Sequence, residues 1–211
     1  MNRSVLVLVG RFLLIFVAVL ALLAGIWRFA APGYAWAVAG LAGPVFRLME
    51  ADDVTRIEAR GDELWVLREI MAGRNAPFTW FDRYVFFAII PLIALFAATP
   101  GLGLGARLLR TAGGLLVLLG VHVLYVVASV ELSYAAIGLT RVGPMTARML
   151  DAWQVMVRIL WEAAPVVVWF SLTFSAWRRR FAELRAESVQ VERPGSATVL
   201  GTGWKAKEGT S

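Results

Sequence analysis

The sequence predicts an all-α integral membrane protein with about four transmembrane helices and a small extracytoplasmic insert that contains a β-hairpin. Of the 211 residues, 59% are hydrophobic and only 17% are charged, whereas soluble domains carry about 25% charged residues. Long apolar runs of this kind are typical of a bilayer protein rather than of a large soluble core. Residues 54–70 differ from the rest because they alternate polar and apolar residues and carry seven charges.

The first expected span is FLLIFVAVLALLAGIW, Phe12–Trp27, within an N-terminal unit of residues 1–28. This apolar run is longer than the hydrophobic part of a usual signal peptide, which covers about 7–15 residues. We therefore expect the span to be retained as an anchor, with cleavage as a signal peptide as the alternative. Arg3 and Arg11 precede the span, where an arginine side chain can extend to the lipid headgroups.

Residues 29–83 form the second unit, an extracytoplasmic or interfacial insert. Its first part, Tyr34–Glu50, is apolar but is interrupted by Gly40, Gly43 and Pro44. These interruptions predict a helix that lies in the membrane interface or re-enters the bilayer, rather than a span.

The second part of the insert, VTRIEARGDELWVLREI, predicts a β-hairpin with a two-residue turn at Gly61-Asp62. The expected register pairs Arg60 with Glu63, Ala59 with Leu64, Glu58 with Trp65, Ile57 with Val66, and Arg56 with Leu67. A helix over Glu63–Met71 is the alternative.

An isolated hairpin is at best marginally stable in water, so its apolar face must rest on another surface. That surface is either the Tyr34–Glu50 segment or a partner protein. The side chains that we expect to dock a partner are Ile57, Leu64, Trp65 and Val66. A passive structured loop is the other interpretation.

The third unit, residues 84–177, is expected to hold three further spans. They cover Tyr84–Ala98, with Pro91 inside it, then about 111–130, and finally a helix from near Met145 to about Trp177. The last helix carries tryptophans at eight-residue intervals, which spiral around a helix instead of forming a stripe. We expect its outer tryptophans to lie at the two membrane interfaces, and we expect no tryptophan-lined site. These tryptophans are Trp153, Trp161, Trp169 and Trp177.

The fourth unit, residues 178–211, is expected to be a basic cytoplasmic tail. Its first three residues, Arg178, Arg179 and Arg180, are predicted to face anionic lipid. Basic residues flank the spans on the side of both termini, so the positive-inside rule predicts that both termini are cytoplasmic. The insert has six arginines but also eight acidic residues. The tail after about Glu187 lacks periodicity and is expected to be largely disordered.

Four ionisable residues are expected inside the membrane: His122, Glu131, Arg158 and Glu162. An ionisable group at that depth suggests a functional role. Tyr125 is expected to share the helix face of His122, and Arg158 and Glu162 are spaced to form an ion pair that faces the bundle. A neutral histidine bonded to a neighbouring helix and a purely structural ion pair are the alternatives.

No enzyme motif is present. The chain has no cysteine and one histidine, which excludes disulfides, thiolate metal sites and paired-histidine metal motifs. The glycines of GLGLG (101–105) join two spans with no strand before them, so they do not form a nucleotide-binding loop. We predict no catalytic residue, no cofactor and no metal. The net charge of +6 is attributed to orientation in the membrane and to anionic lipid, and no nucleic-acid partner is expected.

Three stretches resemble the small membrane proteins associated with exosortases, especially the exosortase H-associated type. They are APGYAWAVAGLAGPVFRLM, VTRIEARGDELWVL and YVFFAIIPLIALFAATPG. The resemblance implies an accessory role in sorting or processing surface proteins in a bacterial envelope, and it carries no active-site residue to this chain. Exosortases resemble cysteine-dependent transpeptidases, and this chain lacks the cysteine.

The sequence therefore predicts a non-enzymatic accessory protein of the bacterial inner membrane whose partners are other membrane proteins and anionic lipid. One alternative is a structural subunit of a larger membrane complex, bound through helix faces such as Ala112–Gly114. The other is a small transporter or proton-conducting component that uses His122, Glu131 and Glu162.

Overall fold

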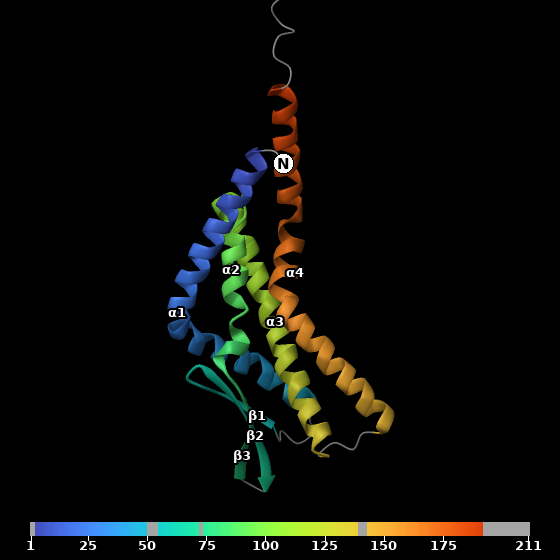
Figure 1. The fold of residues 1–211 in the computed structure, drawn as a ribbon. Helices are drawn as coiled ribbons and strands as arrows, with labels where there is room; N and C mark the ends of the chain where they lie inside the picture. Colours follow the sequence, from blue (N-terminus) through green and yellow to red (C-terminus); the bar gives the residue numbers. More distant parts are fainter. Residues whose placement is uncertain (1–2, 50–54, 72–73, 139–142, 192–211) are drawn as a thin grey trace, which may run out of the picture.

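The computed structural model describes residues 3–49, 55–71, 74–138 and 143–191. Within these residues the chain forms a helical bundle with a small antiparallel sheet at one end (Figure 1). The elements in chain order are α1 (Arg3–Met49), β1 (Thr55–Arg60), β2 (Glu63–Met71), β3 (Arg74–Phe81), the 3-10 helix η1 (Arg83–Phe86), α2 (Ile89–Ala98), α3 (Leu104–Ala136) and α4 (Pro144–Val191).

Three helices in the described part of the chain are long and apolar enough to cross a membrane. They cover Val5–Met49 of α1, Leu104–Ala136 of α3 and Val155–Ala186 of α4. The shortest has 32 residues, about 48 Å at the usual helical rise, and the hydrocarbon core of a bilayer is about 30 Å thick. The predicted mostly helical fold, with long apolar helices that could span a membrane and a strand-containing insert, is therefore confirmed.

The span expected over Tyr84–Ala98 is shorter than predicted. It begins as η1, and α2 has only ten residues, about 15 Å of helix. Pro91 is the third residue of α2, where the backbone N–H has no intrahelical acceptor and its loss costs little. The structure thus has three long apolar helices and one short apolar segment where four spans were expected.

The expected break between the first span and the segment that follows it does not occur, because α1 is continuous from Arg3 to Met49 and includes Pro32 and Pro44. Figure 1 shows that α1 changes direction partway along its length, and Pro32, in its middle third, supplies a physical cause for such a bend. One face of the second half is buried at intervals of three or four residues, the helical period. Its members are Trp27, Ala31, Ala35, Val38, Ala42 and Phe46.

The sheet lies at the opposite end of the bundle from both the Arg3 end of α1 and the Val191 end of α4 (Figure 1). α3 leads toward the sheet end and α4 leads away from it. α4 continues through the basic residues to Val191, so the start of the expected tail is helical. The remainder of the tail, residues 192–211, lies outside the described residues.

A buried polar centre at Thr99 joins the end of α2 to α3 and α4. The Thr99 hydroxyl donates to the Leu95 carbonyl at 2.7 Å and accepts a hydrogen bond from Trp169 Nε1 at 2.8 Å. The Thr99 carbonyl accepts a hydrogen bond from Arg107 Nη2 at 3.2 Å. Trp161 of α4 likewise donates from Nε1 to the Val85 carbonyl at 2.9 Å. These indole N–H groups turn into the bundle, which the eight-residue spacing did not reveal.

Candidate functional site

The hairpin has the predicted register throughout, from Arg60 opposite Glu63 to Arg56 opposite Leu67. Gly61 has a φ of +63°, a conformation that a two-residue hairpin turn requires and that glycine adopts without strain. Arg83 Nη1, just after the sheet, lies 2.9 Å from the Asp62 carboxylate. The alternative of a helix over Glu63–Met71 is wrong.

The inner face of the sheet packs against the helices. Leu64 and Val66 are fully buried, and Ile57 and Ala59 pack against the same core. Ile57, Leu64 and Val66 were expected to dock a partner, and for Leu64 and Val66 the expectation is wrong because both are fully buried. Ile57 is half-buried against the same core. The second half of α1 provides the support that an isolated hairpin lacks.

Tyr134, near the end of α3, anchors the sheet and is only 2% exposed. Its hydroxyl lies 2.8 Å from Thr55 Oγ1 of β1. The guanidinium carbon of Arg68 lies 4.1 Å from the centre of its ring, and the Phe78 ring centre lies 4.7 Å away. One side chain of α3 therefore contacts all three strands that the structure describes.

The strand β3 was not predicted, and a bulge within it positions Phe78. Val66 pairs with Thr79 and Leu67 pairs with Pro77, so Phe78 stands opposite no residue of β2. Such an extra residue redirects its side chain, and here Phe78 turns toward Tyr134. Proline is tolerated at bulges and on edge strands because it has no N–H to donate. Pro77 and the absence of clear alternation hid this strand in the sequence.

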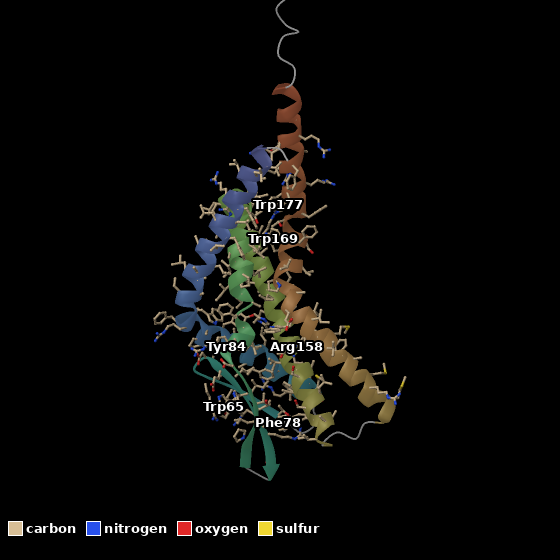
Figure 2. The ribbon with its side chains drawn as sticks, in the orientation of Figure 1. Trp65, Phe78, Tyr84, Arg158, Trp169 and Trp177 are labelled. Carbon is tan, nitrogen blue, oxygen red and sulfur yellow. The ribbon has the colours of Figure 1, made fainter. Side chains whose placement is uncertain are left out.

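The outer face of the sheet carries an aromatic pair, a half-buried Trp65 and an exposed Trp80. Trp65 and Trp80 are register partners whose rings stack with centres 5.9 Å apart and an interplanar angle of 24°. Arg60 lies over the Trp65 ring at 5.0 Å, and Trp65 Nε1 donates to Glu63 at 2.9 Å. Trp80 is 61% exposed. Of the expected docking residues, only Trp65 lies on this face, and sequence reasoning missed Trp80. Figure 2 shows Trp65 at the sheet, below Tyr84 in this view.

His122 is fully buried between helices and is bonded to Tyr34 of α1. The Tyr34 hydroxyl lies 2.7 Å from His122 Nδ1, and the rings of Tyr34 and Phe86 each approach the imidazole edge-on at 5.6 Å. Tyr125, expected to share this face, instead stacks on Trp161 with ring centres 5.3 Å apart. This geometry matches the structural alternative, a histidine bonded to a neighbouring helix.

The carboxylates of the expected proton path do not gather around His122. Glu131 lines a cavity of about 390 Å³ with residues of α3, the end of α1 and Trp153. Arg158 and Glu162 form the predicted ion pair at 3.2 Å, but their side chains are 75% and 56% exposed. The expectation that the pair faces the bundle is wrong, because α4 turns Trp161 and not Glu162 toward its neighbours. Figure 2 shows Arg158 on the α4 ribbon between the two ends of the bundle.

The three consecutive arginines of α4 have different surroundings. Arg178 and Arg179 are exposed, whereas Arg180 is half-buried and contacts Glu183 at 2.8 Å. Arg178 borders an aromatic groove, and Arg180 lines a separate cavity. All three were expected to face anionic lipid from the outer surface. Only Arg179 borders neither the groove nor the cavity.

A double-mutant cycle tests whether the Tyr34–His122 contact is structural. We expect Tyr34→Phe and His122→Leu each to lower the free energy of unfolding by about 1 kcal/mol, since each leaves a buried polar group unpaired. The double variant should lose less than the sum, because it removes both polar partners. Thermal unfolding of the purified protein in detergent measures the four forms.

Tyr125→Phe is the matched control for this cycle, since Tyr125 packs in the same bundle through its ring, against Phe81 and Trp161. It should change stability by a few tenths of a kcal/mol at most. Strict additivity of Tyr34→Phe and His122→Leu would show that the two side chains are not energetically coupled.

A search for related proteins finds no matching family model, no matching curated protein and no matching solved structure.

Proposed function

We propose that this chain is a non-enzymatic accessory protein of the bacterial inner membrane that presents a small sheet outside the bilayer to another membrane or envelope protein. The observation that carries this proposal is the division of the sheet into two faces. Leu64 and Val66 fix one face to the helices, and the other face carries the stacked pair of half-buried Trp65 and exposed Trp80.

The outer face has the composition of a binding surface. Tryptophan and arginine are enriched among the residues that contribute most to protein–protein binding, and Arg60, Trp65 and Trp80 lie together. The stacked rings are held by neighbouring strands and by the Glu63 carboxylate, so little side-chain entropy remains to be lost on binding. A rigid aromatic pair of this kind favours recognition of a protein surface.

The proposed topology has four crossings with both termini in the cytoplasm. The short helix α2 has neighbours on several sides, and most of its residues are buried against α1, α3 and α4. Because it is largely shielded from lipid, it does not need the length of an independent span. The end of the bundle that holds the start of α1 and the end of α4 is rich in basic residues, which favours a cytoplasmic location for that end. These residues are Arg11, Arg107 and Arg178–Arg180.

The resemblance to exosortase-associated proteins suggests the class of partner. A protein that takes part in sorting or processing surface proteins would meet this sheet at the outer side of the inner membrane. In this proposal the sheet does not take part in catalysis. Its role is to hold the partner near the bilayer.

Substitution of the two outer-face tryptophans tests the proposal. The full-length protein, purified in mild detergent from its own cells, should retain a co-purifying envelope protein. The double variant Trp65→Ser/Trp80→Ser should lower the recovered partner by at least about tenfold, since loss of a central aromatic contact typically costs about 2 kcal/mol or more. Deleting residues 54–70 is a poorer test because it also removes Leu64 and Val66 from the core.

Trp36→Ser is the matched control, because Trp36 is 73% exposed on α1 and lies outside the sheet. It should leave the recovered partner unchanged, and all forms should give the same protease-resistant fragments. Equal recovery with the outer-face double variant would refute the docking role.

A further inference from the structure

A basic cavity lies between the helices at the end opposite the sheet. It has a volume of about 430 Å³ and is bordered by Arg11 of α1, Arg107 of α3 and Arg180 of α4, with the turn between α2 and α3 forming another wall. Among the described residues that line it, Glu183 is the sole acidic one. Three arginines and one glutamate give a formal charge of +2, which favours an anion.

The Arg107 guanidinium is held by one hydrogen bond, and its Nε–H has no acceptor in the described structure. Its Nη2 donates to the carbonyl of Thr99 at 3.2 Å, while its Nε is buried with no hydrogen-bond partner in the described structure. A buried donor left unpaired costs about 1–3 kcal/mol. The planar guanidinium presents its N–H groups in the geometry that phosphate oxygens accept. Because Arg107 lines the cavity while its Nη2 is held by the Thr99 carbonyl, its guanidinium places a fixed positive charge at the cavity wall.

An aromatic groove of about 730 Å³ adjoins this cavity, and Phe12 lines both. The Phe12 ring packs against Trp169 and Trp177 with ring centres 5.9 and 5.4 Å away. Phe170, Phe174 and Phe181 complete the apolar wall. Figure 2 shows Trp169 and Trp177 along α4 toward the end where α1 begins. Arg178 and Arg185 border the groove.

We propose that the cavity and the groove together bind one phospholipid with an anionic headgroup. Its phosphate lies among Arg11, Arg107 and Arg180, and an acyl chain lies along the aromatic groove. A free phosphate ion would use the cavity alone, whereas a lipid uses the polar cavity and the apolar groove that Phe12 joins. We expected no tryptophan-lined site, whereas this proposal assigns the groove lined by Trp169 and Trp177 to an acyl chain. The inference rests on insertion in a bilayer and is independent of the role proposed for the sheet.

Lipid competition on the full-length protein tests this site. The protein is transferred into micelles that contain phosphatidylglycerol and phosphatidylcholine with identical acyl chains, and retained lipid is counted by native mass spectrometry. Wild type should retain one phosphatidylglycerol in preference to phosphatidylcholine. Arg11→Gln should lower that preference about fivefold, the effect expected for one basic residue at a lipid surface. Arg11 is exposed, so this variant spares the packing of the bundle.

Arg179→Gln is the matched control, because it removes the same charge at the same end of the bundle but outside both hollows. It should change the preference by less than about twofold. An equal loss in Arg11→Gln and Arg179→Gln, or equal retention of the two lipids by wild type, would overturn the proposal.

Inorganic phosphate at millimolar concentration should not displace the lipid, and displacement that depends on Arg11 would assign the cavity to a soluble anion instead. Partner recovery through the sheet is measured separately, so the two proposals fail independently.

Discussion

Tyr134→Ala is expected to detach the sheet from the helical bundle. The substitution removes the contact with Thr55 at 2.8 Å and leaves Arg68 and Phe78 without the ring on which they pack. Truncation of a buried aromatic residue typically costs about 3–5 kcal/mol. Since the lost contacts all join the sheet to α3, the cost should appear as opening of the sheet. Limited proteolysis of the protein in detergent should show cleavage within residues 55–81 at a rate raised at least tenfold.

Tyr134→Phe separates packing from hydrogen bonding at the same position. It keeps the ring beneath Arg68 and beside Phe78 and removes only the contact with Thr55, so we expect a loss of about 1 kcal/mol and a modest rise in cleavage. Leu124→Ala, on the same helix at a residue that is 46% exposed, should leave the cleavage rate unchanged. If Tyr134→Ala leaves the sheet as resistant as wild type, Tyr134 is not its anchor.

Gly114→Ala is expected to give the second large effect, a loss of about 1–3 kcal/mol from overpacking. A Cβ at this position would lie 2.8 Å from Phe96 Cε2 and 3.4 Å from Val168 Cγ1. Phe96 is fully buried in α2, so its ring has little room to retreat. The close approach of α2, α3 and α4 therefore depends on the missing side chain. Thermal unfolding in detergent measures the change.

The adjacent glycine provides a control of opposite sign. A Cβ on Gly113 would meet nothing within 4 Å, so Gly113→Ala should raise stability by about 0.5–1 kcal/mol through the helix preference of alanine over glycine. Equal effects at the two positions would show that the Phe96 contact does not limit packing. Gly114 packs against Phe96 and Val168 of the same chain. It is therefore not available to another subunit, although Ala112–Gly114 was named as such a face.

Local features made parts of the fold predictable. The hairpin register follows from Gly61-Asp62 and from the two-residue period on either side, because a one-residue shift would place Leu64 and Val66 on the solvent face. Long apolar runs likewise predict α3 and α4. Gly40, Gly43 and Pro44 predict interruptions, although α1, supported by its neighbours, continues through all three to Met49.

Several contacts that define the candidate site join residues that are distant in sequence. His122 and Tyr34 are 88 residues apart and Tyr134 and Thr55 are 79 apart, and no periodicity within one helix predicts either pair. Trp80 lies opposite Trp65 only because β3 forms, and the bulge that accommodates Pro77 weakens the sequence pattern of that strand. Packing against the helices buries the face that carries Leu64 and Val66, so the face that carries Trp65 and Trp80 is left on the outside.

The sequence by itself determined the local properties of this chain: apolar helices, a hairpin of defined register, and arginines near the helix ends. Hydropathy, turn chemistry and side-chain period act over a few residues, so they can be read without a fold. Only the tertiary structure decided that Leu64 and Val66 are core, that Trp80 is exposed beside a half-buried Trp65, and that Arg11, Arg107 and Arg180 share one cavity. These outcomes depend on how α1, α3 and α4 pack, and that packing is set by shape and contact between distant segments.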